Sequence, residues 1–334
     1  MSKPLTVAVT GPTGTFGFGL MPLLESDERI GRVIGIARRP FDPAQHGWSK
    51  MEYRQGDVRD EEALAEAFQG VDVVVHLAFL IASGEPPETI HEINVEGTLN
   101  VFRAAAAAGA TRFVYASSVA AYGFHADNPI GMTETWPTRP ARRMRYAQEK
   151  ARIEELLDEA SGAHPDLDLY VLRPPIVLGP HVVGGKQLLP GPLDGWASRL
   201  ASSLLPLRLP IPALVPTLPV QFIHEDDVGQ AFLLCIVAAG PPGAYNITGD
   251  GVMTGAEVAR ELGIVAVPVP GAIPRAAARL ATALPLPKQL QTDWIESVAQ
   301  PAIMDASKAK QLLGWQPRHS SVEALRDTLR HLAP

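Results

Sequence analysis

The sequence contains very little cysteine. Cys235 is the single cysteine in 334 residues, and it lies within an apolar run. One cysteine cannot form an internal disulfide, and this usage is typical of a reducing compartment. We interpret Cys235 as a small core residue and expect a cytoplasmic protein.

Long uninterrupted apolar runs are also missing. The most apolar stretch, Leu204–Val220, contains five prolines, a density that no membrane-spanning helix tolerates. Met1–Pro4 leads straight into a strand-like segment, without the charged and apolar regions of a signal peptide. The sequence therefore predicts neither a membrane span nor a secretory leader.

An excess of positive charge is absent as well. Lys plus Arg number 29 and Asp plus Glu 36, which gives a net charge of −7. This balance argues against a nucleic-acid partner, which would require a basic face. Four arginines within Arg139–Arg145 are a local exception, and they form either a solvated loop or a grip on an anionic substrate. The nine histidines form no His-x-x-x-His or His-x-x-Glu-His motif, so we expect no metal site.

The first half of the chain alternates short apolar runs with amphipathic segments. Such runs, rich in branched residues, predict buried parallel strands. The predicted strands are Leu5–Thr10, Arg32–Ala37, Met51–Gln55, Asp72–Leu77, Thr111–Ala116 and Asp168–Arg173. The predicted helices are Phe16–Leu24, Asp60–Phe68, Ile93–Ala108 and Tyr146–Ala160. This alternation predicts an α/β fold of Rossmann type, with a doubly wound parallel sheet.

After Arg173 proline becomes frequent and the periodicity weakens. We expect residues 1–175 to form a dinucleotide-binding domain, to which residues 220–240 return. Residues 176–334 would form mostly a smaller, irregular substrate-binding lobe. Helices are predicted there at Glu225–Ala239, Thr254–Leu262, Asp305–Leu313 and Val322–Leu332.

A glycine-rich turn joins the first predicted strand to the first predicted helix. Gly11 would permit the tight turn, Gly14 would let the backbone approach a diphosphate, and Gly17 would allow the helix to pack closely on the strand. Main-chain N–H groups and the helix dipole would then hold the anion. We therefore predict that a dinucleotide binds at Gly11, Thr13, Gly14, Thr15, Phe16 and Gly17.

Tyr146 and Lys150 are four residues apart on a predicted helix, so they share one face. A tyrosine pKa near 10 is too high for acid–base work at neutral pH, and a neighbouring ammonium would lower it. The pair therefore predicts a tyrosine general acid/base supported by a lysine.

The Gly-x-x-Gly-x-x-Gly spacing and the Tyr-x-x-x-Lys pair resemble the extended short-chain dehydrogenase/reductases, the NAD-dependent epimerase/dehydratase family. The resemblance continues through Phe222–Val228 and Leu313–Pro317. Aligned on Tyr122 and Gly123, it places the active-site hydroxyl on Ser118 rather than Ser117, and a supporting Asn at Asn94. It also implies cofactor contacts, besides those of Tyr146 and Lys150, at Asp57, Val58, Leu77, Ala78, Ala116, Pro174 and Ile176. Dimers through a helix pair are usual in this family, so a homodimer is expected by analogy.

The end of the second predicted strand bears on the choice of cofactor. A carboxylate there would bind the ribose hydroxyls of NAD, but Ala37 is followed by Arg38 and Arg39. Arg38 suits a 2′-phosphate, so we favour NADP, with NAD as the alternative.

Departures from the family pattern narrow the reaction. Val119 and Ala120 stand where nucleotide-sugar dehydratases carry an Asp-Glu pair, and Leu218–Gln221 lacks the arginine usual in sugar-nucleotide enzymes. The expected substrate region, Leu188–Pro219 with Trp196, is mostly apolar; these residues either line the site or pack the small lobe. His125 either lines the substrate mouth or is an ordinary loop residue. The leading hypothesis is thus a ketone/alcohol oxidoreductase acting on a largely apolar small molecule. A nucleotide-sugar epimerase that retains NAD and a non-catalytic dinucleotide sensor are the alternatives.

Overall fold

The computed structural model describes residues 3–81, 85–142, 144–182, 212–216, 218–263, 265–269 and 300–332. Its centre is a seven-stranded parallel sheet in the order β11-β6-β5-β4-β1-β2-β3. The strands are β1 (Leu5–Thr10), β2 (Ile30–Ala37), β3 (Met51–Gln55), β4 (Val73–His76), β5 (Arg112–Ala116), β6 (Asp168–Arg173) and β11 (Gly243–Asn246).

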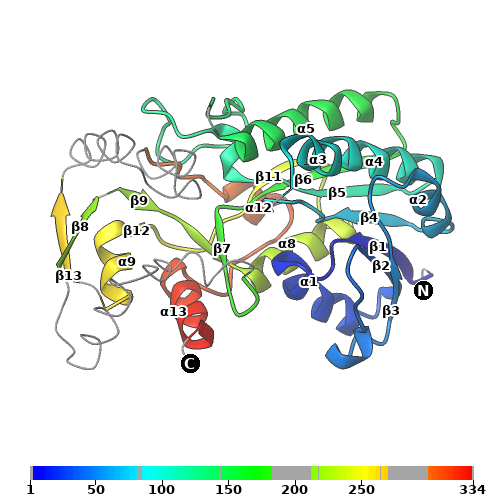
Figure 1. The fold of residues 1–334 in the computed structure, drawn as a ribbon, viewed down its shortest axis with the longest axis horizontal. Helices are drawn as coiled ribbons and strands as arrows, with labels where there is room; N and C mark the ends of the chain where they lie inside the picture. The colour runs from blue at the N-terminus through cyan, green and yellow to red at the C-terminus, as the bar shows by residue number, and fades with distance from the viewer. Residues whose placement is uncertain are drawn as a thin grey trace.

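Helices cover both faces of this sheet (Figure 1). One face carries α1 (Thr15–Ser26) and α8 (Glu225–Ile236). The other carries α2 (Glu61–Ala67), α3 (Pro87–His91), α4 (Gly97–Ala107) and α5 (Arg145–Gly162). The predicted Rossmann-type doubly wound fold is confirmed. The predicted helix Ile93–Ala108 is different in detail, because a π-helical turn, η2 (Glu92–Glu96), precedes α4.

Alternation along the strands builds a core on each side of the sheet. In β1, the fully buried Val7 and Val9 face the layer of α1 and α8, whereas Ala8 faces the opposite layer. Successive side chains of a strand point to opposite faces, and both faces are covered here. This is why the strands read in the sequence as continuous apolar runs.

The order of the strands places a crevice at the carboxyl edge of the sheet. The chain passes from β1 to β2 and β3 on one side, and then crosses to β4 on the other side of β1. Ligands of open α/β sheets bind at such a switch point. The segments that follow β1, β4, β5 and β6 all reach this edge.

The smaller lobe consists of short strand pairs and helices. Its pairs are β7 (Ile176–Leu178) with β10 (Phe222–His224), β9 (Pro219–Val220) with β12 (Met253–Thr254), and β8 (Pro212–Pro216) with β13 (Val265–Val269). Its helices are α9 (Gly255–Glu261) and α13 (Ser321–Leu332), whereas α12 (Ser307–Leu312) packs against β11 and adds Ala309 to the core of the main body. Trp196 and residues 188–211 lie outside the described residues.

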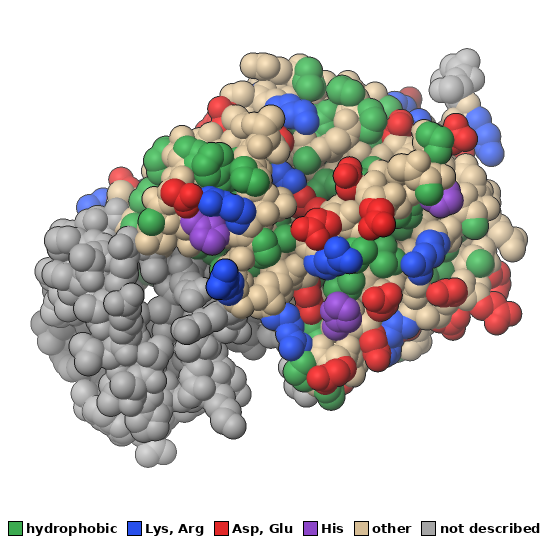
Figure 2. Space-filling model, turned by 90° about the horizontal axis from the view of Figure 1, so that it is seen from above, with side chains coloured by type: hydrophobic (Ala, Val, Ile, Leu, Met, Phe, Trp, Pro, Cys, Tyr) green, Lys and Arg blue, Asp and Glu red, His purple; other side chains and the backbone are tan. Residues whose placement is uncertain are grey.

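Both α8 and β11 come from the second half of the chain but belong to the main body. Helix α8 packs against α1, and β11 pairs with β6. The segment that returns to the main body, predicted as residues 220–240, therefore extends past residue 240, because β11 supplies the seventh strand of the sheet. Among the helices that the structure describes, none is long and apolar enough to cross a bilayer. On the face seen in Figure 2, acidic and basic side chains are interspersed.

Two glycines allow α1 and α8 to touch backbone to backbone. A Cβ atom at Gly229 would lie 2.1 Å from the carbonyl oxygen of Gly19. A Cβ atom at Gly19 would lie 2.1 Å from the carbonyl oxygen of Glu225. Because α8 begins with Glu225, this contact fixes the start of α8 against the helix that follows the glycine turn.

We expect Gly229→Ala to lower the free energy of unfolding by about 1–3 kcal/mol, because the added methyl group overpacks rigid backbone. Gly162→Ala is the matched control: a Cβ atom at Gly162 meets nothing within 4 Å, so this change should be neutral or slightly stabilising. Urea denaturation measures both. Equal stability of the two variants would contradict the close contact.

Candidate active site

The glycine turn lies between β1 and α1, as the sequence predicts. Gly11 has φ +73°, and a Cβ atom there would lie 2.8 Å from the main chain of Ala78, in the loop after β4. A Cβ atom at Gly17 would lie 2.0 Å from the carbonyl oxygen of Pro12. Gly17 therefore lets the helix pack on the turn itself, whereas the sequence argument had it pack on the strand.

The first turn of α1 suits an anion. Gly14 caps the helix without a side-chain hydrogen bond, so no side chain of the cap competes for the N–H groups that a diphosphate would use. The ring of Phe16 packs on Phe232, with ring centroids 6.2 Å apart. Phe16 can therefore offer its main chain to a ligand, while its side chain belongs to the core. Thr13 and Thr15 are half-buried in the same turn.

A polar chain runs beneath this turn. His76 at the end of β4 is fully buried and contacts Thr10 through Nδ1 (2.7 Å) and Thr98 through Nε2 (2.9 Å). Thr98 donates its hydroxyl proton to the carbonyl of Asn94, so Nε2 of His76 must donate to Thr98. Burial, with Lys150 nearby, lowers the pKa of His76 to about 3. His76 is therefore a neutral structural link between β1, β4 and the helix that carries Asn94.

The ends of β2 and β3 lie at one side of the carboxyl edge, where the adenosine of a dinucleotide is predicted to bind. Arg38 directly follows β2 and its side chain is exposed. Asp57 follows β3, and its carboxylate accepts from Arg59 Nη2 at 2.8 Å and Nε at 3.1 Å. The bond to Arg59 lowers the pKa of Asp57, and Arg38 contributes a smaller effect. Val58 is buried beside them.

Tyr146 and Ser118, the predicted general acid/base and its hydroxyl partner, lie close to each other. Tyr146 lies in the first turn of α5, and Ser118 caps a 3-10 turn, η3 (Val119–Tyr122), just past the end of β5. Burial raises the pKa of Tyr146, and its hydrogen bond with Ser118 offsets part of this rise. In the chain alone the pKa shift is thus upward, opposite to the direction expected from the sequence, because desolvation dominates.

Lys150 lies one turn further along α5 and is only 3% exposed. Its Nζ donates to the carbonyl of Ala116 (2.6 Å) and to the hydroxyl of Tyr115 (3.3 Å), and lies 3.7 Å from the ring centroid of Phe79. Burial lowers the pKa of Lys150 to about 7, although nearby Glu154 and Glu149 raise it in part. Lys150 is therefore held toward the end of β5, with Ala116 as its anchor.

Phe79 was not identified from the sequence. Its ring stands edge-on to Tyr146 at a centroid distance of 5.5 Å, while its face covers the ammonium of Lys150. The only sequence feature that could have indicated Phe79 was its aromatic side chain in the loop after β4. Phe79 makes the surroundings of both Tyr146 and Lys150 more apolar.

A buried ion pair engages Ser117, the neighbour of the predicted Ser118. Arg173, at the end of β6, binds Glu154 on α5, and Ser117 donates to the same carboxylate. Arg173 also donates to the hydroxyl of Tyr122 at 2.7 Å. The hydroxyl of Ser117 is thus committed to the core, and Ser118 is the one that contacts Tyr146.

Asn94 supports the site from the π-helical turn. Its side chain accepts from the N–H of Leu80 (2.7 Å) and donates to the carbonyl of Leu80 (3.0 Å) and to Glu149 (2.8 Å). It therefore fixes the loop that carries Phe79 to the helix that carries Tyr146. π-Helical turns occur frequently at functional sites, and this one places Asn94 where it can bridge the two.

The remaining predicted residues lie around the same edge. Leu77 and Ala78 follow β4, and Pro174 accepts from the N–H of Val119 at 2.9 Å. Ile176 is 41% exposed in β7. His125 binds the carbonyl of Arg139 through Nε2, so its ring is tied to a neighbouring loop.

The segment after β7 lies over the start of α1. This contact was not predicted from the sequence. Thr15 Oγ1 donates to the carbonyl of His181 (3.1 Å), and the ring of His181 stacks on Phe18 at 4.4 Å. His181 Nδ1 is 2.6 Å from the carboxylate of Glu225. Burial raises the pKa of Glu225, and His181 lowers it in part. The sequence held no periodic signal for this contact between distant segments.

The buried Lys150 predicts a specific pH dependence of stability. Its pKa is about 7 in the folded chain and 10.5 in its ordinary state, so between these pH values the unfolded chain binds more protons. The free energy of unfolding should then rise with pH, by up to about 1.4 kcal/mol per unit. We expect Lys150→Met to remove this rise. Urea denaturation at pH 7, 8 and 9 measures the free energy of unfolding of both proteins. If this free energy changed with pH by the same amount in the two proteins, a desolvated Lys150 would be ruled out.

Known proteins resemble the chain in sequence and fold. An uncharacterized protein of Sinorhizobium fredii is 29% identical over 332 residues, which span 97% of this chain and 77% of that protein. The structure of a UDP-glucose 4-epimerase from Thermotoga maritima with UDP-glucose has a TM-score of 0.71 and 20% identity, covering 98% of both chains. The structure of a dTDP-glucose 4,6-dehydratase from Bacillus anthracis in complex with NAD has a TM-score of 0.70 and 16% identity, covering 98% of this chain and 96% of that one.

A family model matches residues 7–248, which include the glycine turn, Ser118, Tyr146 and Lys150. This is most of the chain and, apart from the first two residues of β1, all of the sheet. The chain belongs to the NAD dependent epimerase/dehydratase family.

Proposed function

We propose that the chain is an NAD(P)-dependent oxidoreductase that interconverts a ketone or aldehyde and an alcohol, with Tyr146 as the general acid/base. One observation carries this proposal. The side chain of Ser118 lies close enough to that of Tyr146, at the carboxyl edge of the sheet, to lower the pKa of the phenol. Two converging hydroxyls of this kind can bind one carbonyl or alcohol oxygen.

Each side chain has a distinct part in the chemistry. A bound nicotinamide would supply or accept the hydride. Tyr146 donates its phenol proton to the substrate oxygen during reduction, and Ser118 polarises that oxygen by a hydrogen bond. The raised pKa of Tyr146 keeps the phenol protonated at neutral pH, which is the form that reduction requires. Lys150 provides a cation near the site that favours the phenolate left behind.

The described wall of the site is apolar, which supports an apolar substrate. Tyr146 packs in a cluster with Phe124 and Met144, and Phe79 stands at its edge. Val119 and Ala120, where a dehydratase would carry its acids, are buried. A lipophilic ketone or alcohol therefore matches the surroundings better than a sugar, whose hydroxyls would need polar partners.

We further propose NADP as the preferred cofactor. Arg38 is placed at the end of β2 with its guanidinium exposed, and the chain continues with a second arginine. A guanidinium matches a phosphate by paired hydrogen bonds. NAD is the alternative, because the dehydratase structure similar to this chain contains it.

A second candidate is a nucleotide-sugar epimerase that retains NAD. The fold similarity to the Thermotoga maritima epimerase with UDP-glucose favours it. Such an enzyme returns its hydride to the substrate and consumes no cofactor, so net oxidation of NADPH distinguishes the two functions. A sensor without catalysis is disfavoured, because Tyr146 and Lys150 are both present and close to each other.

Tyr146→Phe is expected to lower kcat by about 100- to 10,000-fold, because the proton donor is lost while the ring is kept. The loss of NADPH absorbance is followed with a lipophilic ketone that the wild type reduces. Tyr170→Phe is the matched control, since its hydroxyl donates to Gly240 at 2.9 Å instead of to the site. Turnover near that of the wild type in folded Tyr146→Phe would refute the mechanism.

Arg38→Ala is expected to weaken NADPH binding by about 10- to 100-fold, the loss of one charge-assisted contact. NADH binding should change little, because NADH has no 2′-phosphate. Fluorescence titration measures both affinities. Arg32→Ala, which removes an exposed ion pair with Glu52 at the other end of β2, should leave both unchanged. Equal effects of Arg38→Ala on the two cofactors would contradict the assignment.

A further inference from the structure

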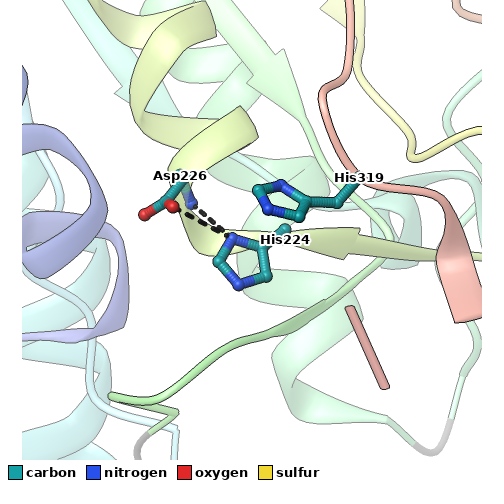
Figure 3. Close-up of side chains that lie close together, drawn as sticks. All are labelled: His224, Asp226 and His319. Atoms are coloured by element: carbon teal, nitrogen blue, oxygen red, sulfur yellow. Dashed lines mark hydrogen bonds and ion pairs between the residues drawn. The ribbon is translucent and has the colours of Figure 1, made fainter. Parts of the chain in front are cut away.

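Two histidines and an aspartate from distant parts of the chain meet beside the start of α8. His224 ends β10, Asp226 lies in the first turn of α8, and His319 comes from the loop before α13. One potential ligand atom from each lies within 4.8 Å of the other two. Figure 3 shows the two imidazole rings beside each other with Asp226 next to them. The rings stack at a centroid distance of 4.1 Å.

Carboxylates behind the rings determine which nitrogens carry protons. His224 Nε2 is 3.2 Å from Asp327, and His319 Nδ1 is 3.3 Å from Asp227. A carboxylate only accepts, so both of these nitrogens carry protons. His224 Nδ1 accepts from the N–H of Asp226 at 3.2 Å, so its lone pair caps α8, and a bound metal ion would replace this hydrogen bond. Because Nδ1 of His319 faces Asp227, its Nε2 is the ring nitrogen that could bind a metal ion.

This pattern is the one that metal-binding histidines use. A ligating imidazole almost always donates its other N–H to a carboxylate or carbonyl, which fixes the tautomer and orients the ring. Both rings here have that partner, and Asp227 is fully buried and also accepts from the N–H groups of Arg318 and His319. Both rings therefore have the carboxylate partner that a metal-bound histidine uses.

We propose that His224, His319 and Asp226 bind a first-row divalent metal ion such as Zn²⁺, with water as a fourth ligand. Two imidazoles and a carboxylate suit these ions. Asp226 Oδ2 is 3.5 Å from His224 Nδ1, and tetrahedral zinc places its ligand atoms about 3.3 Å apart. Asp226 is 55% exposed and His319 is 32% exposed, so small rotations of these side chains can close the site.

The ion would connect the C-terminal segment to the main body. His319 and Asp327 belong to the segment around α13, while His224 and Asp226 flank Glu225, which holds His181 over the glycine turn. Sequence spacing gave no sign of this site, because its histidines are 95 positions apart and form no local motif.

Zn²⁺ binding to the tag-free full-length protein, first treated with chelator, tests the proposal. Calorimetric titration should show one Zn²⁺ per chain with a Kd in the micromolar range or tighter. Excess Zn²⁺ of about 100 Kd should raise Tm by about 3–6 °C. Co²⁺ should give visible d–d absorption with intensity typical of four-coordinate geometry.

His319→Gln and Asp226→Asn should each weaken Zn²⁺ binding at least tenfold and reduce the Tm shift by about half or more. His91→Gln is the matched control, because His91 is an exposed histidine 3.9 Å from Glu96 on a different surface. Binding that persists unchanged in folded His319→Gln, or the absence of stoichiometric binding in the wild type, would overturn the proposal. His319 and Asp226 are both partly exposed, so these variants should fold, and neither touches Tyr146 or the glycine turn.

Discussion

The position of the catalytic candidates depends on one buried ion pair, between Arg173 and Glu154. Each side chain is less than one-tenth exposed, and such a pair survives burial only when further hydrogen bonds satisfy both partners. Ser117 and Tyr122 provide these bonds. Because Glu154 lies four residues after Lys150 on α5, the pair fixes that helix against the ends of β5 and β6. The face that carries Tyr146 and Lys150 is thereby aimed at the carboxyl edge.

Desolvation then sets the protonation states at that edge. It raises the pKa of Tyr146 and lowers those of Lys150 and His76, so in the chain alone Tyr146 and His76 are neutral at neutral pH, while Lys150 is partly charged. In a site of this kind the electrostatic interactions of a charged ligand are stronger, because little water is present to screen them. The apolar cover of Phe79 and the polar clamp of Asn94 on Leu80 both contribute to this environment.

Much of the fold could be predicted from the sequence, because a parallel sheet buried on both faces leaves continuous apolar runs. Strands Leu5–Thr10, Met51–Gln55 and Asp168–Arg173 match the structure residue for residue. The Tyr-x-x-x-Lys pair and the glycine turn were also visible, since both are local. Contacts between distant segments could not be predicted, because no periodic pattern in the sequence signals them. Examples are the ion pair of Arg173 with Glu154, the contact of His181 with Glu225 and the stacking of His319 on His224. The smaller lobe was least predictable, because its strands are short and rich in proline.

We propose, centrally, that this site releases its oxidised cofactor and binds NADPH from solution in each turnover. An epimerase would instead keep one NAD bound and return the hydride to its substrate. Identification of the nucleotide released when extensively dialysed, tag-free protein is denatured tests this proposal directly. The account predicts far less than one equivalent of nicotinamide nucleotide per chain, and recovery of binding when NADPH is added back. Close to one equivalent of NAD, retained through dialysis, would contradict it and favour an epimerase that keeps its own hydride carrier.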